Sequence, residues 1–230
     1  MPTDLSAAMP TISKTALAPS APVRVSFPTG LLKNIIDFVG ALVALILFAP
    51  IFLVITVVLK LTQEGPIFFS HTRIGKDGKE FRCLKFRTMV PEAAEMLDEI
   101  LMSDPIAREE WNANYKLDND PRVTRFGAFL RKSSLDELPQ IFNVLKNDMS
   151  LVGPRPITKS EGELYGRHYS VYKSVRPGLT GLWQISGRSD TSYEERVLLD
   201  VNYVRNLAAW RDIYILLMTV FVVLVRKGAQ

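Results

Sequence analysis

The chain has 230 residues, with 28 Lys and Arg against 24 Asp and Glu, a net charge of +4 and 47% hydrophobic residues. This composition excludes wholesale disorder and a polytopic membrane protein, but it allows a single membrane segment. The one cysteine, Cys83, excludes a disulfide framework and a thiolate zinc or iron–sulfur site. The mild basic excess favours anionic partners, namely phosphates, acidic lipid headgroups or nucleic acid.

The N-terminal segment is rich in Pro, Ser, Ala and Thr. Residues 1–26 show no apolar period, so we expect a flexible tail there. An apolar run then covers residues 38–59, which contain no charged side chain and one polar one, Thr56. A helix of these 22 residues reaches about 33 Å, slightly more than the roughly 30 Å of a bilayer's hydrocarbon core. By length alone, the run is typical of a straight transmembrane anchor.

Two features complicate a straight span. Pro50 lies past the middle of the run and leaves the Ile46 carbonyl without its helical hydrogen bond, which predicts a kink. Basic residues also flank the run on both sides, including Lys33 before it and Lys60 after it. Because positive charge favours the cytoplasmic side, a helix that enters, bends at Pro50 and returns would satisfy both flanks. The residues alone leave both arrangements open and favour the straight span by length.

Downstream, the pattern predicts short strands and helices. The pair Asp77-Gly78 between residues 67–69 and 81–86 predicts a β-hairpin. The apolar residues 213–225 are too few to span a bilayer easily and predict a buried or interfacial helix. Further helices are predicted over 92–116, 123–132, 134–146 and 194–210, with a turn at 118–121 and a loop at 176–181 leading into a strand at 182–185. The predicted fold class is α+β, mostly helical, with one small hairpin.

Asp136 and Glu137 are the candidate catalytic residues. The pattern Ser134-x-x-Glu137 is typical of a capping box, and capping alone would account for both acids. A carboxylate at a helix N-terminus also stays ionised at neutral pH, because the helix dipole favours the anion. An ionised carboxylate can attack phosphorus or carbon, and its neighbour can hold a hard cation such as Mg²⁺.

Basic residues accompany this acidic pair in the sequence. Arg131 lies shortly before it, and Arg155 is held between Pro154 and Pro156, which lowers the entropy cost of fixing its guanidinium. A guanidinium fork of this kind suits a diphosphate. No Walker loop or GxGxxG motif is present, and the spacing of the two histidines supports no nucleophilic triad.

Four motifs occur in order along the chain. They are Lys85-Phe86-Arg87-Thr88-Met89, Ser134-Leu135-Asp136-Glu137-Leu138-Pro139-Gln140, Met149-Ser150-Leu151-Val152-Gly153-Pro154-Arg155-Pro156 and Arg176-Pro177-Gly178-Leu179-Thr180-Gly181-Leu182-Trp183-Gln184. From about residue 32 to the C-terminus, the chain resembles the bacterial sugar transferases, the monotopic phosphoglycosyl transferases. It is most similar to the short exopolysaccharide-initiating members, especially galactosyl-phosphate transferases.

The resemblance implies an activity and its location. Such enzymes transfer a hexose 1-phosphate, here galactose or glucose, from a UDP-sugar to undecaprenyl phosphate and release UMP. They do so at the cytoplasmic face of the bacterial inner membrane, as the first membrane step of exopolysaccharide biosynthesis. The expected partners are therefore a UDP-sugar, undecaprenyl phosphate and the lipid bilayer, and the expected cofactor is Mg²⁺.

The resemblance also implies roles for individual residues. Asp136 would be the nucleophile that forms a covalent phosphosugar intermediate, and Glu137 would bind Mg²⁺. Lys85 and Arg131 would bind phosphate, and the nucleotide motif would be Pro154, Arg155 and Pro156. The family's membrane helix is re-entrant and broken at a Ser-Pro pair, which here is Ala49-Pro50, so the serine hydroxyl is missing.

The expected organisation is a flexible tail over residues 1–30, a re-entrant membrane helix over 31–62 and a catalytic domain over 63–230. Two rivals stay open: a membrane-anchored scaffold in which the two acids only cap a helix, and an enzyme of the same chemistry that spans the membrane. A nucleic-acid binder is not expected, because the charge is modest and no groove-reading motif is present. The sugar, including its N-acetylated forms, and assembly into a homo-oligomer also stay open.

Overall fold

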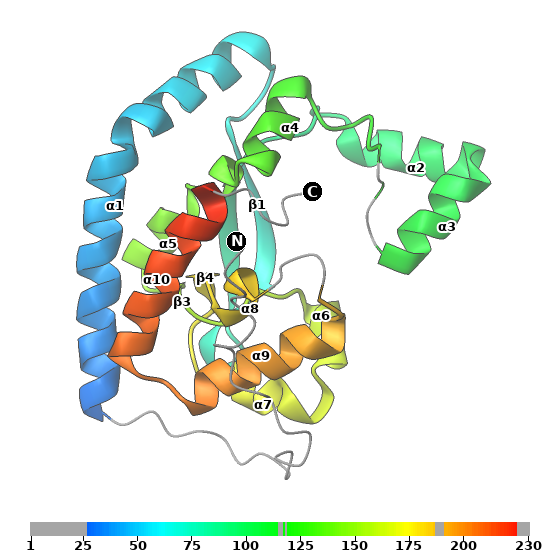
Figure 1. Cartoon of the computed structure of the whole chain (residues 1–230). Helices are drawn as coiled ribbons and strands as arrows, with labels where there is room; N and C mark the ends of the chain where they lie inside the picture. The colour runs from blue at the N-terminus through cyan, green and yellow to red at the C-terminus, as the bar shows by residue number, and fades with distance from the viewer. Residues whose placement is uncertain (1–26, 115–116, 118, 187–190, 225–230) are drawn as a thin grey trace, which may run out of the picture.

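Helices make up most of the structure, a computed structural model that describes residues 27–114, 117, 119–186 and 191–224 (Figure 1). Two small sheets of two strands each complete it. This confirms the predicted α+β, mostly helical class. The predicted tail falls largely on residues 1–26, which lie outside the described residues.

The apolar run forms part of one long helix, α1 (Phe27–Thr62). Pro50 lies inside it, and the helix continues through the proline while its axis changes direction in the lighter-blue part of the ribbon (Figure 1). Residues Gly30–Thr62 have a mean hydropathy of 3.1 in their most apolar window, and 11% of that window is buried. The helix is thus long and apolar enough to cross a membrane, and protein covers little of it.

The predicted hairpin is confirmed. Strands β1 (Phe68–Ile74) and β2 (Glu80–Phe86) pair antiparallel, with Phe68 opposite Phe86. The short helix η3 (Lys76–Gly78) forms the connection, in which Asp77 and Gly78 adopt φ angles of 57° and 76°. These left-handed conformations suit the Asp-Gly pair that predicted the turn.

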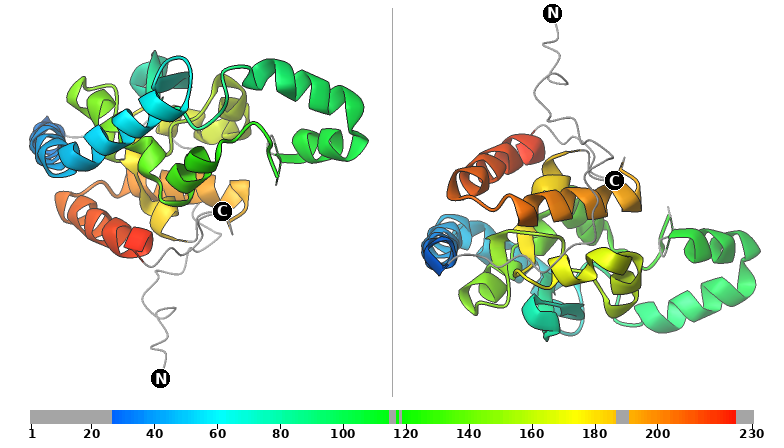
Figure 2. Two further views of the ribbon diagram at one scale, coloured as in Figure 1. Left: turned by 90° about the horizontal axis from the view of Figure 1, so that it is seen from above. Right: turned by 90° about the horizontal axis from the view of Figure 1, so that it is seen from below.

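The region predicted to be helical over 92–116 is helical but contains two helices in place of one, and its residues 115–116 lie outside the described residues. Helix α2 (Ala93–Ser103) ends before Asp104, and helix α3 (Pro105–Asn114) begins at the next residue. The Asp104 carboxylate accepts the backbone N–H of Ile106 at 2.9 Å, as an N-cap does, and Pro105 occupies the first helical position that proline favours. Figures 1 and 2 show the pair extending away from the rest of the molecule.

The predicted helix over 134–146 is wrong. Helix α4 (Arg125–Lys132) precedes this region as predicted, but the region itself contains the short 3₁₀ helix η4 (Leu135–Glu137) and helix α5 (Gln140–Leu145). Pro139 separates the two, because a proline lacks the N–H that a continuous helix requires.

A parallel pair, β3 (Ser150–Val152) and β4 (Gly178–Thr180), forms the second sheet. The predicted loop at 176–181 therefore contains a strand, and the predicted strand at 182–185 is helix α8 (Leu182–Ile185). The predicted helix over 194–210 ends early, since α9 (Tyr193–Arg205) stops before Asn206 and α10 (Ala209–Leu224) starts after it. The remaining elements are α6 (Lys159–Leu164), η5 (Gly166–His168) and α7 (Tyr169–Tyr172).

Two buried clusters hold these elements together. The larger one joins the hairpin, the β3–β4 pair, α7, α9 and α10 through side chains such as Ile157, Tyr172 and Tyr203. The smaller one joins α1 to the hairpin and α4. In it, the ring centroids of Phe52, on α1, and Phe86, on β2, are 4.8 Å apart.

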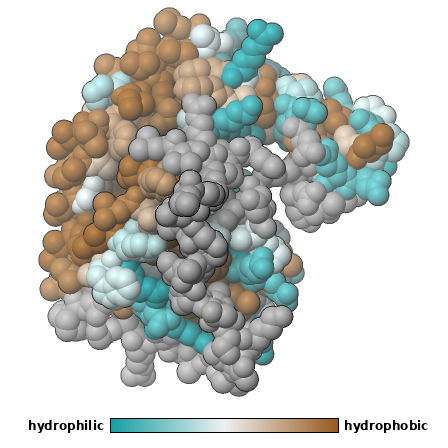
Figure 3. Space-filling model, in the orientation of Figure 1, coloured by the Kyte–Doolittle hydropathy of each residue, from teal (hydrophilic) through white to brown (hydrophobic). Residues whose placement is uncertain are grey.

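Apolar side chains also gather on the outside. They cover the side of the molecule formed by α1 and α10 (Figure 3). On α10 the exposed ones are Trp210, Ile213, Tyr214, Leu217, Val220 and Phe221. The buried or interfacial helix predicted over 213–225 thus corresponds to α10, which buries Ile215 and presents an apolar stripe to the outside.

Candidate active site

The two predicted catalytic acids share one lysine. The Lys85 Nζ lies 2.7 Å from Glu137 Oε1 and 3.4 Å from Asp136 Oδ2. Lys85 lies on strand β2 and the two acids lie on η4, so residues about fifty positions apart meet at one point. The Asp136 side chain is 10% exposed and that of Glu137 is 40% exposed, so the pair has one sheltered and one open carboxylate.

The local backbone explains this arrangement. Ser134 adopts φ 57°, and its side chain makes no capping hydrogen bond. The expected capping box therefore does not form, because the left-handed residue starts a single 3₁₀ turn in place of an α-helix. This left-handed turn leads the chain into η4, where the two acids meet Lys85.

Burial and neighbouring charges shift the pKa values of Asp136 and Lys85. Burial raises the pKa of the Asp136 carboxyl above its ordinary value, and Glu137 adds to this effect while Lys85 and Arg131 oppose it. Burial alone would lower the pKa of Lys85, but the two carboxylates raise it above its usual value. Lys85 and Arg131 thus favour the Asp136 anion, whereas burial, which has the largest effect, and Glu137 oppose it.

Arg131 belongs to the same site. It lies in the last turn of α4, and its Nε donates to Thr88 Oγ1 at 2.9 Å. Helix α4 approaches the segment after β2 closely, since a Cβ on Gly127 would lie 2.0 Å from the Thr88 carbonyl oxygen. That contact requires glycine and fixes α4 against the end of the strand that carries Lys85. Thr88 thus positions Arg131. The sequence analysis placed Thr88 inside a motif but gave this residue no role.

The Pro154-Arg155-Pro156 segment follows β3. Its path depends on backbone packing against β4, because a Cβ on Gly178 would lie 2.1 Å from the Gly153 nitrogen. The Gly178 N–H also donates to the Pro154 carbonyl at 2.8 Å. Two motifs that are distant in the sequence are thus pressed together, with glycines where they touch.

The buried carboxyl of Asp200 contacts the backbone of Arg155. The Arg155 N–H donates to Asp200 Oδ2 at 3.4 Å, and the Tyr165 hydroxyl donates to the same oxygen at 2.7 Å. Burial raises the pKa of Asp200 to about 7, although these two hydrogen bonds oppose the effect. The Arg155 guanidinium lies over the Trp183 ring, 5.4 Å from its centroid. Sequence reasoning missed Asp200, and its position on α9 gave no pattern that points to Arg155.

Cys83 connects the two parts of the site. Its thiol is buried on β2, and burial raises its pKa to about 11, so it stays protonated at neutral pH. Lys85, Glu137 and Arg155 all act electrostatically on this thiol. Charges from both the acidic pair and the Arg155 segment therefore act on one buried side chain.

Other basic residues near the motifs have structural partners. Arg122 is buried and forms a 2.7 Å ion pair with Asp120, and Arg87 donates to the Glu64 carbonyl at 2.9 Å. Ala49 and Pro50 lie on the exposed face of α1, away from these polar groups.

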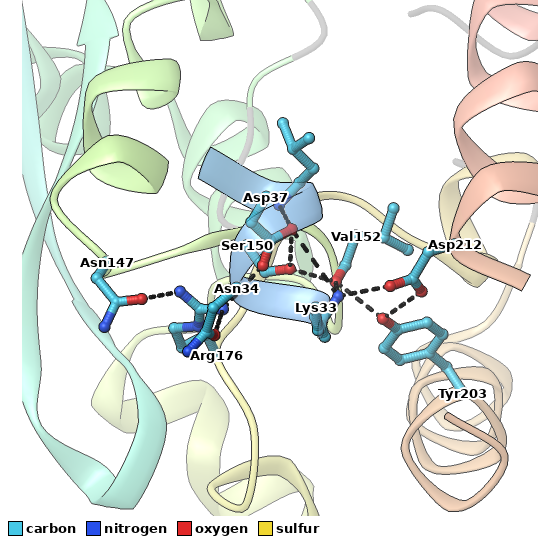
Figure 4. Close-up of polar contacts among 10 residues, drawn as sticks. Lys33, Asn34, Asp37, Asn147, Ser150, Val152, Arg176, Tyr203 and Asp212 are labelled. Atoms are coloured by element: carbon cyan, nitrogen blue, oxygen red, sulfur yellow. Dashed lines mark hydrogen bonds and ion pairs between the residues drawn. The ribbon is translucent and has the colours of Figure 1, made fainter. Parts of the chain in front are cut away.

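A second polar group, which we call the anchor network, ties the start of α1 to the domain (Figure 4). Lys33 forms a 2.7 Å ion pair with Asp212 of α10, and Asp37 forms a 2.8 Å ion pair with Arg176. The full network is Lys33, Asn34, Asp37, Asn147, Ser150, Arg176, Tyr203, Asp212 and the Val152 carbonyl. Sequence reasoning did not find it, although Lys33 and Asp37 stand one helical turn apart beside an apolar run.

The oxygen donors at η4 fit a magnesium ion that substrate helps to hold. Mg²⁺ commonly binds one or two carboxylates and completes its shell with water and substrate phosphates. Asp136 and Glu137 offer two neighbouring carboxylates. Within the described residues, no group of three or more His, Cys, Asp or Glu side chains is placed to hold a metal. A site made by protein alone is therefore not expected among them.

With this geometry established, comparison with known sequences identifies the family. The sequence model described as "Bacterial sugar transferase" matches residues 28–226. The chain belongs to the bacterial sugar transferase family. The family match confirms the resemblance inferred from the four motifs.

Individual relatives cover most of this chain. The exopolysaccharide production protein ExoY of Rhizobium meliloti is 49% identical over 200 residues, which are 87% of this chain and 88% of ExoY. The undecaprenyl-phosphate galactose phosphotransferase of Salmonella typhimurium is 52% identical over 199 residues, 86% of this chain and 41% of that protein. The UDP-galactose-lipid carrier transferase of Erwinia amylovora is 51% identical over 198 residues, 86% and 41% respectively. The chain thus spans less than half the length of the last two relatives and most of ExoY.

Proposed function

We propose that this sugar transferase moves a hexose 1-phosphate from a UDP-sugar to undecaprenyl phosphate and releases UMP. The observation that carries the proposal is the meeting of Asp136, Glu137 and Lys85, beside Arg131, at the end of the hairpin. The Salmonella and Erwinia relatives are named for galactose transfer involving lipid carriers, and ExoY is named for exopolysaccharide production. These names support a role in the first membrane step of exopolysaccharide biosynthesis.

The reaction proceeds by two displacements at one phosphorus. A carboxylate oxygen of Asp136 attacks the β-phosphorus of the UDP-sugar, and the bond from that phosphorus to the bridging oxygen breaks. UMP leaves with the electron pair, and the sugar phosphate stays on Asp136 as an acyl phosphate. A phosphate oxygen of undecaprenyl phosphate then attacks the same phosphorus, which restores the carboxylate and gives a polyprenyl diphosphate sugar.

The cations around Asp136 suit this chemistry. Phosphoryl transfer depends mainly on positioning and on stabilising negative charge. Lys85 holds both acids and keeps its proton, so it brings a positive charge next to the attacked phosphorus. Arg131 is oriented by Thr88, and within the described residues its Nε is the one nitrogen that donates to a neighbour. Its terminal nitrogens are thus available for a phosphate oxygen.

Magnesium would be held by Glu137, with Asp136 close by and the substrate phosphates completing the shell. When bound, the ion would neutralise charge on the diphosphate and on the leaving UMP. Glu137 is the more exposed of the two acids, which suits a ligand that must meet an ion carried by substrate. Asp136 is the more sheltered, which suits a nucleophile whose covalent adduct must be protected from water.

Several observations support a membrane-bound enzyme that does not cross the bilayer. The domain contacts α1 near its start through Lys33 and farther along through Phe52. Just after the helix ends, the Gln63 side chain donates to Thr124 Oγ1 at 2.9 Å. A straight span would draw these contacts, and the charged Asp212 with them, into hydrocarbon, where buried charge is costly. The apolar face of α1 and α10 can instead enter one leaflet, with the active site at the cytoplasmic surface of the inner membrane.

Cysteine labelling tests this topology. Cys83 is 3% exposed and reacts poorly, so cysteines introduced as Ser6→Cys and Gln230→Cys report on the two ends of the chain. We expect an impermeant maleimide to label neither in intact spheroplasts and both after permeabilisation. Labelling of one end alone in intact spheroplasts would support the spanning rival.

Mass spectrometry tests the covalent step. The protein incubated with UDP-galactose alone is expected to gain the mass of one hexose phosphate, and the adduct is expected to map to Asp136. Asp136→Asn should lose both the adduct and turnover with undecaprenyl phosphate. Normal turnover by Asp136→Asn would overturn the proposal, because Asp136 could then not be the nucleophile. A panel with UDP-glucose and the N-acetylated donors identifies the sugar, for which the relatives' names favour galactose.

A further inference from the structure

A second guanidinium lies beside the Arg155 segment. The Arg196 Cζ, on α9, lies 5.1 Å from the centroid of the Trp183 ring, and the Arg155 Cζ lies 5.4 Å from the same centroid. The two side chains come from different elements, so the fold brings two positive charges to one indole. Neither guanidinium forms an ion pair with another described residue, and Arg196 Nε donates only to Thr191 Oγ1, at 3.3 Å.

Nearby acids do not balance these charges. The carboxylate of Glu161 is engaged by Arg73 at 2.9 Å and by the N–H of Thr158 at 2.7 Å. Asp200 contacts the Arg155 backbone, and its pKa of about 7 leaves it only partly ionised at neutral pH. Burial, followed by the charge of Arg155, lowers the pKa of Arg196 below its ordinary value, and the opposing effects of Tyr193 and Glu161 do not restore it.

The indole adds an unused donor. Trp183 Nε1 is buried, and it has no hydrogen-bond acceptor among the described residues. A buried N–H without a partner is costly, and such groups in native proteins are commonly satisfied by a bound molecule or water. Two guanidinium groups and one buried N–H donor therefore lie at one indole, and apart from the Arg196–Thr191 hydrogen bond these side chains have no acceptor among the described residues. All three groups bind the same kind of ligand, an oxyanion.

We propose that Arg196, together with Arg155 and Trp183, binds a phosphate group of a substrate. The inference deepens the proposed function, on which it rests, and adds α9 to the site. Because the attacked phosphorus must lie beside Asp136 and Lys85, Arg196 contacts a different phosphate: the one that leaves with the nucleotide, or the one that the polyprenyl acceptor brings. Both are phosphate monoesters or diphosphates, so they present the same oxygens.

Direct binding separates the two sources. In full-length protein carrying Asp136→Asn, which prevents turnover, titration calorimetry measures the Kd of UDP-galactose. Arg196→Gln should raise this Kd by about tenfold or more, since a charged hydrogen bond in a site of this kind typically contributes that much. Arg205→Gln is the matched control, because it removes the same charge from an exposed position on the same helix, and it should leave the Kd unchanged.

The second arm uses the active protein. If Arg196 serves the acceptor, Arg196→Gln leaves the Kd of UDP-galactose unchanged and raises the KM for undecaprenyl phosphate by a similar factor. Arg196→Met, which keeps the aliphatic stem over the indole, decides the question if the Gln variant does not fold. Unchanged values for both ligands in a folded variant would overturn the inference while leaving the proposed reaction intact. Failure of the Asp136→Asn protein to bind either ligand would overturn both.

Discussion

Replacing Lys33 with Met removes one partner from a buried ion pair and tests how α1 is held. Lys33 Nζ lies 2.7 Å from Asp212 Oδ2, and the two side chains are 11% and 4% exposed. Removing one member of such a pair typically costs about 3–5 kcal/mol, because the other charge stays buried without compensation. Asp212 keeps the hydroxyl of Tyr203 at 2.8 Å, so we expect about 3 kcal/mol, the low end of this range.

Thermal unfolding in lipid nanodiscs measures this effect. For a chain of this size, about 3 kcal/mol lowers the Tm by roughly 6–12 °C. Lys60→Met is the control, because Lys60 is an exposed lysine in the last turn of the same helix, and its loss should change little. The double variant Lys33→Met with Asp212→Asn should lose less stability than the two single changes together, since it removes both charges. A Lys33→Met variant as stable as Lys60→Met would refute the view that this pair anchors the helix.

Three further outcomes follow from the site. Gly127→Ala should destabilise the protein by about 1–3 kcal/mol in chemical unfolding, because its Cβ would lie 2.0 Å from the Thr88 carbonyl oxygen; full stability would mean that α4 moves freely. Asp200 has a folded pKa of about 7, raised from 3.8, so it favours the folded state at acid pH, and this contribution is lost as pH rises through that interval. Asp200→Asn should therefore flatten the dependence of Tm on pH between these two pKa values. An unchanged slope would mean that other groups cause the pH dependence. The rate of adduct formation should fall as pH drops through the pKa of Asp136, which is raised, and a rate that increases toward acid pH would argue against an ionised nucleophile.

Local patterns predicted the elements whose cause is local. The hairpin followed from Asp77-Gly78, and the long apolar helix followed from its composition. The two helix boundaries that the predictions missed were also visible locally. Pro105 and Pro139 lie where the structure interrupts the predicted helices. A proline can begin a new helix but cannot continue an existing one without losing a hydrogen bond. The predictions over 92–116 and 134–146 did not use Pro105 and Pro139 as helix boundaries.

Other features depend on partners that spacing does not reveal. The β4 strand exists because Gly178–Thr180 pairs with β3, whereas Leu182–Ile185, rich in large apolar side chains, forms a helix. The Lys33–Asp212 pair joins residues 179 positions apart. Asp200 and Arg196 lie on a helix whose sequence shows ordinary charged positions, and only packing brings them to the Arg155 segment. Motifs located the candidate catalytic acids, while the groups that position them required the fold.

The anchor network and the active site share strand β3. The Val152 carbonyl accepts from Lys33 at 2.9 Å and from the Tyr203 hydroxyl at 2.9 Å, and Arg155 follows three residues later. The same strand pairs with β4, whose Gly178 N–H fixes the Pro154 carbonyl. A displacement of α1 relative to the domain must therefore act on β3 and on the guanidinium that follows it. In the proposed reaction, which joins a water-soluble nucleotide sugar to a lipid phosphate, this connection would fix the height of Arg155 relative to α1, the helix proposed to enter the membrane.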